Sequence, residues 1–393
     1  MTKLIPDNPN RVLMPDLTRA FALFGIAVVN VTGFAQPLTT GFHAGGLERP
    51  VDQLAYGAVA SLFLMKSYPL FSMMFGAGLF YQQAAAARSG AAFAPRHFRR
   101  MAALVALGAV HFVFFWMGDI LMAYGLLGAL FYLQRGVSVR ALVRTGAALI
   151  ALNTALLLVL GGLLWLTEQT APEQIPAAGY DRMTADALAA FGGGSFVDAA
   201  RYRLGLLPAL LVGLLGQQGL SVFGFFCLGL AAAKAGVLEQ PDAPIWRLAR
   251  RVFLPAGLAG SLLGAWILLQ AGSSTDSTFL LGCAVIMAFS GFAALGYLGL
   301  IAAVSKQAGP LRRFAARAGS ASLTAYLLQS LLLSLIFTAY GFGAFGRLTA
   351  GEAIAAAAGV AALSLGVSGV WRSLAQRGPV EVLLRRVTYW GRA

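Results

Sequence analysis

The sequence contains few charged residues for its length. Asp, Glu, Lys and Arg make up 11% of its 393 residues, whereas an average soluble domain carries about 25%. So few charges cannot cover a surface that faces water. Most of the outer surface must therefore face lipid, and the composition excludes an ordinary water-soluble protein.

Cysteine is also scarce, and the common cofactor motifs are missing. Cys227 and Cys283 are the two cysteines, and both lie inside apolar runs, which favours small buried hydrophobes over a disulfide or a metal site. The chain has no Walker loop, dinucleotide fingerprint, zinc spacing or GxSxG elbow. We therefore expect no metal and no covalently bound cofactor. Residues 1–19 lack an apolar core followed by a cleavage site, so we expect no cleavable signal peptide.

Apolar residues are abundant and form long runs. They make up 59% of the chain, and a helix needs roughly 20 of them to cross the bilayer. Barrel strands alternate apolar and polar residues, whereas residues 149–166 are apolar except for Asn153 and Thr154. We predict an all-α, polytopic transmembrane helical bundle of about ten spans. The predicted spans are residues 20–36, 58–86, 101–117, 119–134, 146–167, 206–235, 253–271, 278–304, 320–340 and 352–370.

The basic residues predict the orientation of these spans. Nearly all of the 29 lysines and arginines fall in alternate loops. The intervening loops hold Arg49, Arg182, Arg201, Arg203 and Arg347. Because cytoplasmic loops of membrane proteins carry the excess of positive charge, we expect both termini in the cytoplasm. The same rule explains the net charge of +14 without nucleic acid as a partner.

Two apolar stretches, residues 51–87 and 204–235, are too long for one straight span. We predict that each is one span plus an interfacial or broken segment, with Pro69 and residues 217–219 as break points.

We predict one integral membrane domain, residues 1–393. Halves 1–167 and 204–393, joined by an external amphipathic cap at 168–203, are an alternative division. The segments Phe75-x-x-Gly78-Leu79 and Phe226-x-x-Gly229-Leu230 share a short pattern. Transporters often contain internal repeats, and this similarity is a weak indication of one.

Two residues are the predicted catalytic pair. His111 lies deep in the third predicted span, where an imidazole can act as general base, nucleophile or proton carrier. Asp119 follows Gly118 at the start of the next span. It is interpreted either as a helix N-cap or as the partner that orients His111. Eight residues on one straight helix correspond to about 12 Å, so a direct bond between them needs a turn at Gly118 or a bridging water. His111 packed as a neutral structural residue is the alternative.

A second group of residues could bind ligands. Lys66 either extends to the headgroups or contacts a substrate anion. Arg19 either pairs with Asp16 or binds a cytosolic phosphate. Arg99 and Arg100 either set the orientation or attract an anionic headgroup or nucleotide. The predicted substrate contacts are polar residues in otherwise apolar helices: Asn30, Tyr124, Tyr326 and Gln329. His43 and His97 fall in predicted loops and are assigned no role.

Five motifs in order resemble the YeiB-like family of bacterial membrane proteins, a family of unknown function. They are Asp16-Leu17-Thr18-Arg19-Ala20-Phe21; Phe71-Ser72 with Phe75-Gly76-Ala77-Gly78; Gly108-x-x-His111 with Trp116-x-Gly118-Asp119-Ile120-Leu121 and Tyr124; Ser322-Leu323-Thr324-x-Tyr326 with Gln329-Ser330 and Gly341-x-Gly343; and Gly378-Pro379-Val380-Glu381 ahead of Arg385. Two positions depart from the family pattern. Ala20 replaces a glycine after the arginine, and Val382 and Leu384 replace tryptophans.

The resemblance implies a function through a wider group, because YeiB-like proteins are similar to transmembrane acyltransferases. Those enzymes pass an acyl group from cytosolic acyl-CoA to an acceptor at or across the membrane, with a histidine in the active site. Carried over, this makes His111 the catalytic base. Under this acyl-transfer hypothesis Asp119 orients His111 or contacts the acceptor, and Arg19, Lys66, Arg99 and Arg100 are candidate contacts for the CoA phosphates.

Three functions are therefore compared: membrane-bound acyl transfer, transport or export of a small or amphiphilic solute, and a structural or lipid-binding role. The expected location is the bacterial inner membrane. The expected partners are membrane lipids, acyl-CoA and an unidentified acceptor, with homo-oligomer formation left open.

Overall fold

The computed structural model describes residues 12–175, 177–307 and 309–390. The signal-peptide expectation for residues 1–11 therefore lies outside the described part. Every regular element in the described part is helical, which confirms the predicted all-α class.

Eight helical segments are long and apolar enough to cross a membrane, counted over the described residues. They are α1 (Met14–Ala35), α2 (Pro50–Leu62) with α3 (Ser67–Arg88), α4 (Phe93–Phe114), α6 (Val139–Thr170), α8 (Phe196–Lys234), α9 (Pro244–Leu248) with α10 (Leu254–Leu269), α11 (Ser277–Ser305) and α14 (Ala350–Leu374). A ninth span arises if α12 (Pro310–Ser320) and α13 (Ser322–Phe337), which meet at a 79° bend, are taken together. The protein is a polytopic helical bundle.

The fourth predicted span, residues 119–134, is shorter than expected. It forms α5 (Leu121–Phe131), a helix of 11 residues, or about 16 Å against a hydrocarbon layer of about 30 Å. It packs against α4, where Gly125 lies close to the backbone of Met101. A turn at residues 115–120 joins α4 and α5 into a hairpin, and this turn determines the candidate site.

The two long stretches behave differently from the prediction. The first breaks at Phe63–Lys66 instead of at Pro69, because Pro69 lies in the first turn of α3, where a missing N–H is harmless. The second does not break at all, since α8 continues through residues 217–219. The Asn153 amide of α6 donates a hydrogen bond to the Gln217 carbonyl there. The predicted external cap contains α7 (Ala177–Ala187), while α8 begins within the predicted cap at Phe196.

Helices α3 and α8, which carry the two similar motifs, pack closely against each other. A Cβ atom at Gly76 of α3 would collide with the Phe226 backbone, and one at Gly229 of α8 would collide with the Met73 backbone. Gly229 is a matched position of the second motif, whereas Gly76 lies between the matched positions of the first and the matched Gly78 does not face α8, so the contact does not support an internal repeat. Without a hydrophobic force between helices in lipid, such close approach is a main source of helix association.

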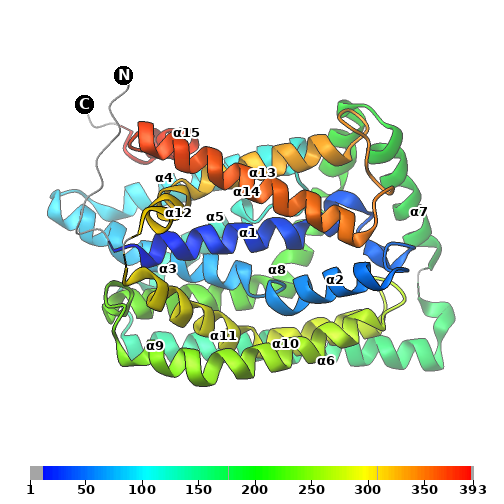
Figure 1. Cartoon of the computed structure of the whole chain (residues 1–393), viewed down its shortest axis with the longest axis horizontal. Helices are drawn as coiled ribbons and strands as arrows, with labels where there is room; N and C mark the ends of the chain where they lie inside the picture. Colours follow the sequence, from blue (N-terminus) through cyan, green and yellow to red (C-terminus); the bar gives the residue numbers. More distant parts are fainter. Residues whose placement is uncertain (1–11, 176, 308, 391–393) are drawn as a thin grey trace.

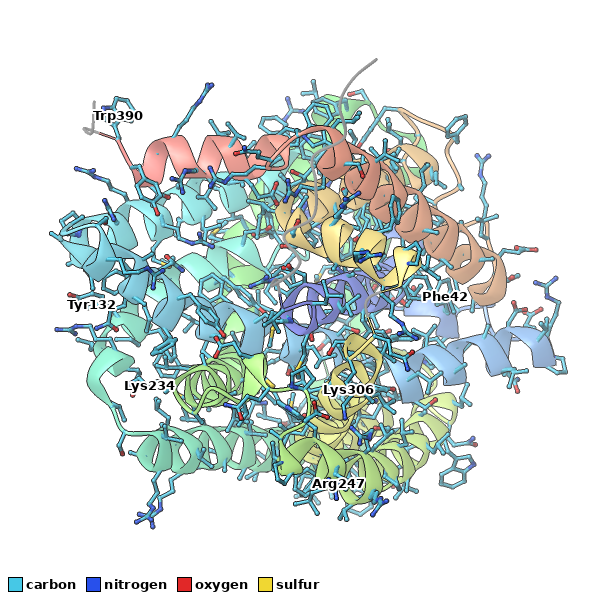
Figure 2. The ribbon with its side chains drawn as sticks, turned by 60° about the vertical axis from the view of Figure 1, so that its left-hand side comes forward. Phe42, Tyr132, Lys234, Arg247, Lys306 and Trp390 are labelled. Carbon is cyan, nitrogen blue, oxygen red and sulfur yellow. The ribbon has the colours of Figure 1, made fainter. Side chains whose placement is uncertain are left out.

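The two ends of the bundle differ in charge. The start of α1, α9 and α15 (Pro379–Thr388) lie at one end of the molecule, and α7 lies at the other (Figure 1). In Figure 2, which turns the first end forward, Lys234, Arg247 and Lys306 lie on it. We call it the basic end, and the opposite one the α7 end.

Candidate functional site

His111 and Asp119 form a buried pair. His111 Nδ1 donates a hydrogen bond to Asp119 Oδ2 across 2.7 Å, and the two residues are only 1% and 4% exposed. A carboxylate can only accept, so this bond places the proton of a neutral imidazole on Nδ1 and leaves a lone pair on Nε2. Nε2 is the atom that could take a proton from a reactant.

The hairpin turn makes this pair possible. Helix α4 ends at Phe114, and the backbone N–H groups of Phe115 and Trp116 both return to the His111 carbonyl. The chain then reverses, which brings Asp119 back beside His111 without a bridging water. Asp119 Oδ1 also accepts a hydrogen bond from the Met122 N–H at 2.9 Å. Asp119 therefore fills both predicted roles, because one carboxylate oxygen caps the helix and the other orients His111.

Gly108 gives the carboxylate its space. It lies one turn before His111 on α4, and a Cβ atom there would be 2.6 Å from Asp119 Oδ1 and closer still to the Met122 N–H nitrogen. The spacing Gly108-x-x-His111 thus places the histidine beside the carboxylate and leaves room for the start of α5.

The other imidazole nitrogen has no partner. His111 Nε2 is buried without a hydrogen bond among the described residues, as are the Tyr326 hydroxyl and both amide atoms of Gln329. The Tyr326 ring centroid lies 5.0 Å from that of His111. Unpaired polar groups are expensive to bury, and their concentration here indicates a place for a ligand or water.

His111 borders an apolar groove of about 350 Å³ between α4 and α13, which we call the α4–α13 groove. It is lined by Leu107, Val110, His111, Phe115, Thr324, Leu327, Leu328, Leu331 and Val380. The Thr324 hydroxyl bonds to Glu381 at 2.5 Å. Among these lining residues, His111 Nε2 is the buried polar side-chain atom without a partner.

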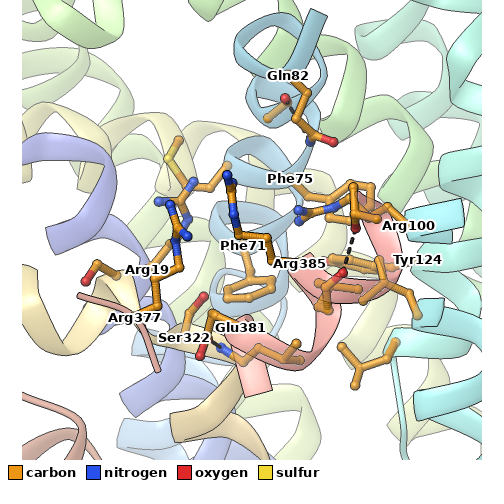
Figure 3. A pocket seen from close by; sticks show the side chains of 18 of the residues that line it. Arg19, Phe71, Phe75, Gln82, Arg100, Tyr124, Ser322, Arg377, Glu381 and Arg385 are labelled. Atoms are coloured by element: carbon orange, nitrogen blue, oxygen red, sulfur yellow. Dashed lines mark hydrogen bonds between the residues drawn. The ribbon is translucent and has the colours of Figure 1, made fainter. Parts of the chain in front are cut away.

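A separate cavity of about 510 Å³ opens at the basic end, and we call it the basic pocket (Figure 3). Its charged lining residues are Arg19, Arg100, Arg372, Arg377, Arg385 and Glu381. They come from α1, α4, α14, α15 and the segment between α14 and α15. Helices that are distant in sequence therefore gather positive charge around one space, as an anion site requires.

Glu381 uses its carboxylate to cap a helix. Its Oε1 accepts hydrogen bonds from the N–H groups of Leu323 and Thr324 at 2.8 and 3.1 Å. A carboxylate is favoured at the N-terminus of a helix such as α13. The one acidic residue in the pocket lining is thus occupied, and the arginines dominate its charge.

The predicted anion contacts separate into two groups. Arg19 and Arg100 line the basic pocket, although Arg19 also pairs with Asp16 at 2.9 Å. Arg99 does not line it and donates a hydrogen bond to the Trp390 carbonyl. Lys66 is fully buried at the α2–α3 break, where its ammonium donates to the Ala60 carbonyl at 3.0 Å. It neither extends to the headgroups nor reaches the pocket, because the broken helix needs a donor for a freed carbonyl.

The predicted substrate contacts are also distributed over several places. Tyr124 lines the basic pocket and bonds to the Ser72 hydroxyl at 2.6 Å. Tyr326 and Gln329 lie buried on α13, and the Tyr326 ring contacts that of His111. Asn30 lines a third cavity of about 320 Å³, whose lining also includes Trp116 of the hairpin turn.

Sequence reasoning missed three arginines of the basic pocket, Arg372, Arg377 and Arg385. The resemblance gave a signal for Arg385, which follows the Gly378-Pro379 motif, but the prediction used all three only for orientation.

It also missed Arg203, which is 3% exposed and donates to the Phe114 carbonyl at the end of α4. It was predicted in an external loop, where nothing suggested that its charge stabilises a helix C-terminus.

Two further expectations can be compared with the structure. His97 lies in α4, not in a loop, and its ring bonds to the Gly128 carbonyl at 2.9 Å. Cys227 and Cys283 are buried free thiols, as predicted. In the described ranges, no group of three His, Cys, Asp or Glu side chains is placed to hold a metal.

His111 does not line the basic pocket. The apolar lining of the basic pocket includes Leu104 and Leu121, while His111 lines the α4–α13 groove. Leu121 is two residues from Asp119, and Leu104 is seven residues before His111, about 10 Å along α4. The pocket lining thus comes close to the pair along the chain, while the groove lining includes His111 itself.

These features define a polytopic helical membrane protein with a buried His–Asp pair between a basic pocket and an apolar groove. The profile of a family described as "Protein of unknown function (DUF418)" matches residues 232–391. The chain is 27% identical to "Uncharacterized protein YxaH" of Bacillus subtilis (strain 168), over 99% of this chain and 97% of the relative. It is 28% identical to "Uncharacterized protein YeiB" of Escherichia coli (strain K12), over 95% of both chains. No solved structure matches it. Over nearly its whole length, the chain is therefore similar to YxaH and YeiB.

Proposed function

We propose that the protein is a membrane-bound acyltransferase that moves an acyl group from cytosolic acyl-CoA to an acceptor at or across the bacterial inner membrane. The observation that carries this proposal is the His111–Asp119 pair, with Nδ1 held and Nε2 unpartnered. An imidazole arranged in this way suits a general base, because the carboxylate both orients the ring and stabilises the cation formed on proton uptake.

The basic pocket suits the donor. Acyl-CoA carries several phosphate charges, and arginine is the preferred side chain for phosphate because its planar fork matches the oxygens. The basic end would face the cytosol by the positive-inside rule. The long pantetheine arm is the part of acyl-CoA that would cover the distance from the arginines to the catalytic pair.

The direct test combines binding with turnover. Acetyl-CoA at 100 times its Kd should stabilise the purified protein by about 2.7 kcal/mol against thermal unfolding. The His111→Gln variant should keep this stabilisation but lose acyl transfer to a membrane extract by a factor of roughly 10²–10⁴. His97→Gln is the matched control, because His97 is also a buried histidine of α4 but lies at the Gly128 carbonyl. If acetyl-CoA neither stabilises the protein nor is consumed with any extract, the proposal is wrong.

Transport of a small or amphiphilic solute is the second candidate, and two observations favour it. The α2–α3 span is broken around the buried Lys66, and broken helices are common at transporter sites. Residues at and next to the hairpin turn also line two separate cavities, since Leu121 lines the basic pocket and Trp116 lines the cavity that contains Asn30. Solute flux in proteoliposomes that persists in His111→Gln, without acyl-CoA binding, would favour transport.

A further inference from the structure

The α4–α13 groove combines an apolar wall with one polar atom that has no partner. His111 is 1% exposed, and its Nε2 makes no hydrogen bond among the described residues. Thr324, the other polar lining residue, is already bonded to Glu381. A ligand in the groove would therefore meet one hydrogen-bonding position, at the ring of the predicted base.

The neighbourhood of the groove indicates the kind of ligand. Val110 and Leu331 line it and are 51% and 38% exposed, which in a membrane-spanning bundle means exposure to lipid. Among the residues that the structure describes, no charged side chain lines the groove, whereas the basic pocket contains five arginines. A water-soluble or strongly charged molecule would lose its hydration here without compensation. A hydrocarbon chain has no favourable hydration to lose and can enter the groove without this cost.

We propose that the α4–α13 groove is a lateral entrance for the acceptor, a membrane amphiphile whose chain lies in the groove and whose hydroxyl or amino group donates a hydrogen bond to His111 Nε2. This inference rests on the proposed acyl transfer, for which it names the acceptor class. The donor and the acceptor then reach the pair by separate routes, the donor from the basic end and the acceptor from the bilayer.

The reaction in this arrangement balances without a further reactant. His111 Nε2 takes the proton of the acceptor O–H or N–H while that oxygen or nitrogen forms a bond to the thioester carbonyl carbon. The carbon–sulfur bond breaks as the tetrahedral intermediate collapses. The leaving thiolate receives the proton from the imidazolium, which restores the neutral ring.

Binding can be tested independently of turnover by photo-crosslinking in phosphatidylethanolamine–phosphatidylglycerol vesicles. The probe is a long-chain alcohol with a diazirine in its chain, and the comparison probe is its methyl ether, which has no proton to donate. The alcohol should label α4 and α13 about tenfold more than the ether, and His111→Leu should remove this preference. Equal labelling by the two probes, or labelling mapped to other helices, would overturn the proposal.

The route to the site can be tested by filling the groove. Leu328→Trp places a large side chain in the lining, and Leu363→Trp is the control on the exposed face of α14, where Leu363 is 56% exposed. Leu328→Trp should lower acetyl transfer to the long-chain alcohol at least tenfold and leave acetyl-CoA binding and transfer to a short, water-soluble alcohol unchanged. Equal loss for both alcohols with binding intact would exclude lateral entry but leave acyl transfer standing. Absence of acetyl transfer to any acceptor, with the crosslinking result intact, would instead exclude the acyltransferase and leave the amphiphile site.

Discussion

The two oxygens of Asp119 connect local folding with chemistry. One caps the first turn of α5 through Met122, and the other holds His111 Nδ1. The carboxylate cannot move toward either partner without weakening its bond to the other. His111 is therefore held by the same contact that starts the next helix, which keeps the imidazole in one orientation.

The variant Asp119→Asn should separate these two roles. Asparagine is a good N-cap and can keep the bond from the Met122 N–H, but it has one acceptor oxygen instead of two. The ring of His111 then loses its orienting acceptor, and we expect acyl transfer to fall by roughly 10²–10⁴-fold with little change in thermal stability. Turnover and thermal unfolding of the same preparation measure the two effects.

The variant Asp119→Ala is the control for the cap. It removes both bonds, so it should lower activity as Asp119→Asn does and also lower the free energy of unfolding by about 1 kcal/mol. Equal stability of the two variants would show that the cap contributes nothing.

The arginines of the basic pocket can be tested with neighbouring residues. Arg385 lines the pocket, whereas the adjacent Arg386 on α15 does not. Arg385→Gln should weaken acetyl-CoA binding by about three- to tenfold, which corresponds to about 0.6–1.4 kcal/mol for a partly solvated contact. Arg386→Gln should leave the Kd unchanged. Titration of both variants with acetyl-CoA at two salt concentrations measures the Kd. If both substitutions raise the Kd equally, the arginines act only through the overall positive potential of the basic end.

At the scale of helices, small residues decide which elements meet. Helices α3 and α8 approach closely because each presents a glycine to the other's backbone, Gly76 to Phe226 and Gly229 to Met73. Helix α13 is fixed in another way, since Glu381 of α15 caps its first turn. Packing and capping between distant segments thus hold α13, which carries Tyr326 and Gln329, in place beside α4.

A single methyl group tests the α3–α8 contact. Gly229→Ala would drive a Cβ atom into the Met73 carbonyl, and we expect the free energy of unfolding to fall by roughly 1–3 kcal/mol. Gly216→Ala on the same helix is the matched control, because nothing lies within 4 Å of a Cβ atom there. Thermal unfolding in one detergent compares the two. If both variants are as stable as the parent protein, the close approach of α3 and α8 is wrong.

At the scale of the whole molecule, the two ends of the bundle differ in the charged residues and cavities that they contain. The basic end contains the arginine-lined pocket, and the α7 end contains α7 and the buried Arg203. The groove lies on the lateral surface between them. The His111–Asp119 pair is therefore positioned where a soluble anion and a membrane amphiphile could meet.

Cysteine labelling in intact cells should reveal the orientation. The two native thiols are buried, so an introduced cysteine gives the main signal. Arg182→Cys on α7, where the side chain is 85% exposed, should react with a membrane-impermeant maleimide from outside. Arg386→Cys on α15 should react only after the membrane is opened. The reverse pattern would place the basic end outside the cell and exclude a cytosolic donor site.

The sequence by itself determined the helical class, most of the spans and the candidates His111 and Asp119, because hydrocarbon imposes long apolar helices and makes isolated polar groups conspicuous. The sequence did not predict that α5 is short, that the chain breaks at Lys66 or that α8 is unbroken. These features depend on which groups form hydrogen bonds with the backbone N–H and C=O groups. Only the tertiary structure decided that the turn after Phe114 joins His111 to Asp119, and that arginines from the first and last helices share one pocket. Those contacts join residues far apart in the chain, and no local pattern records a distance between two helices.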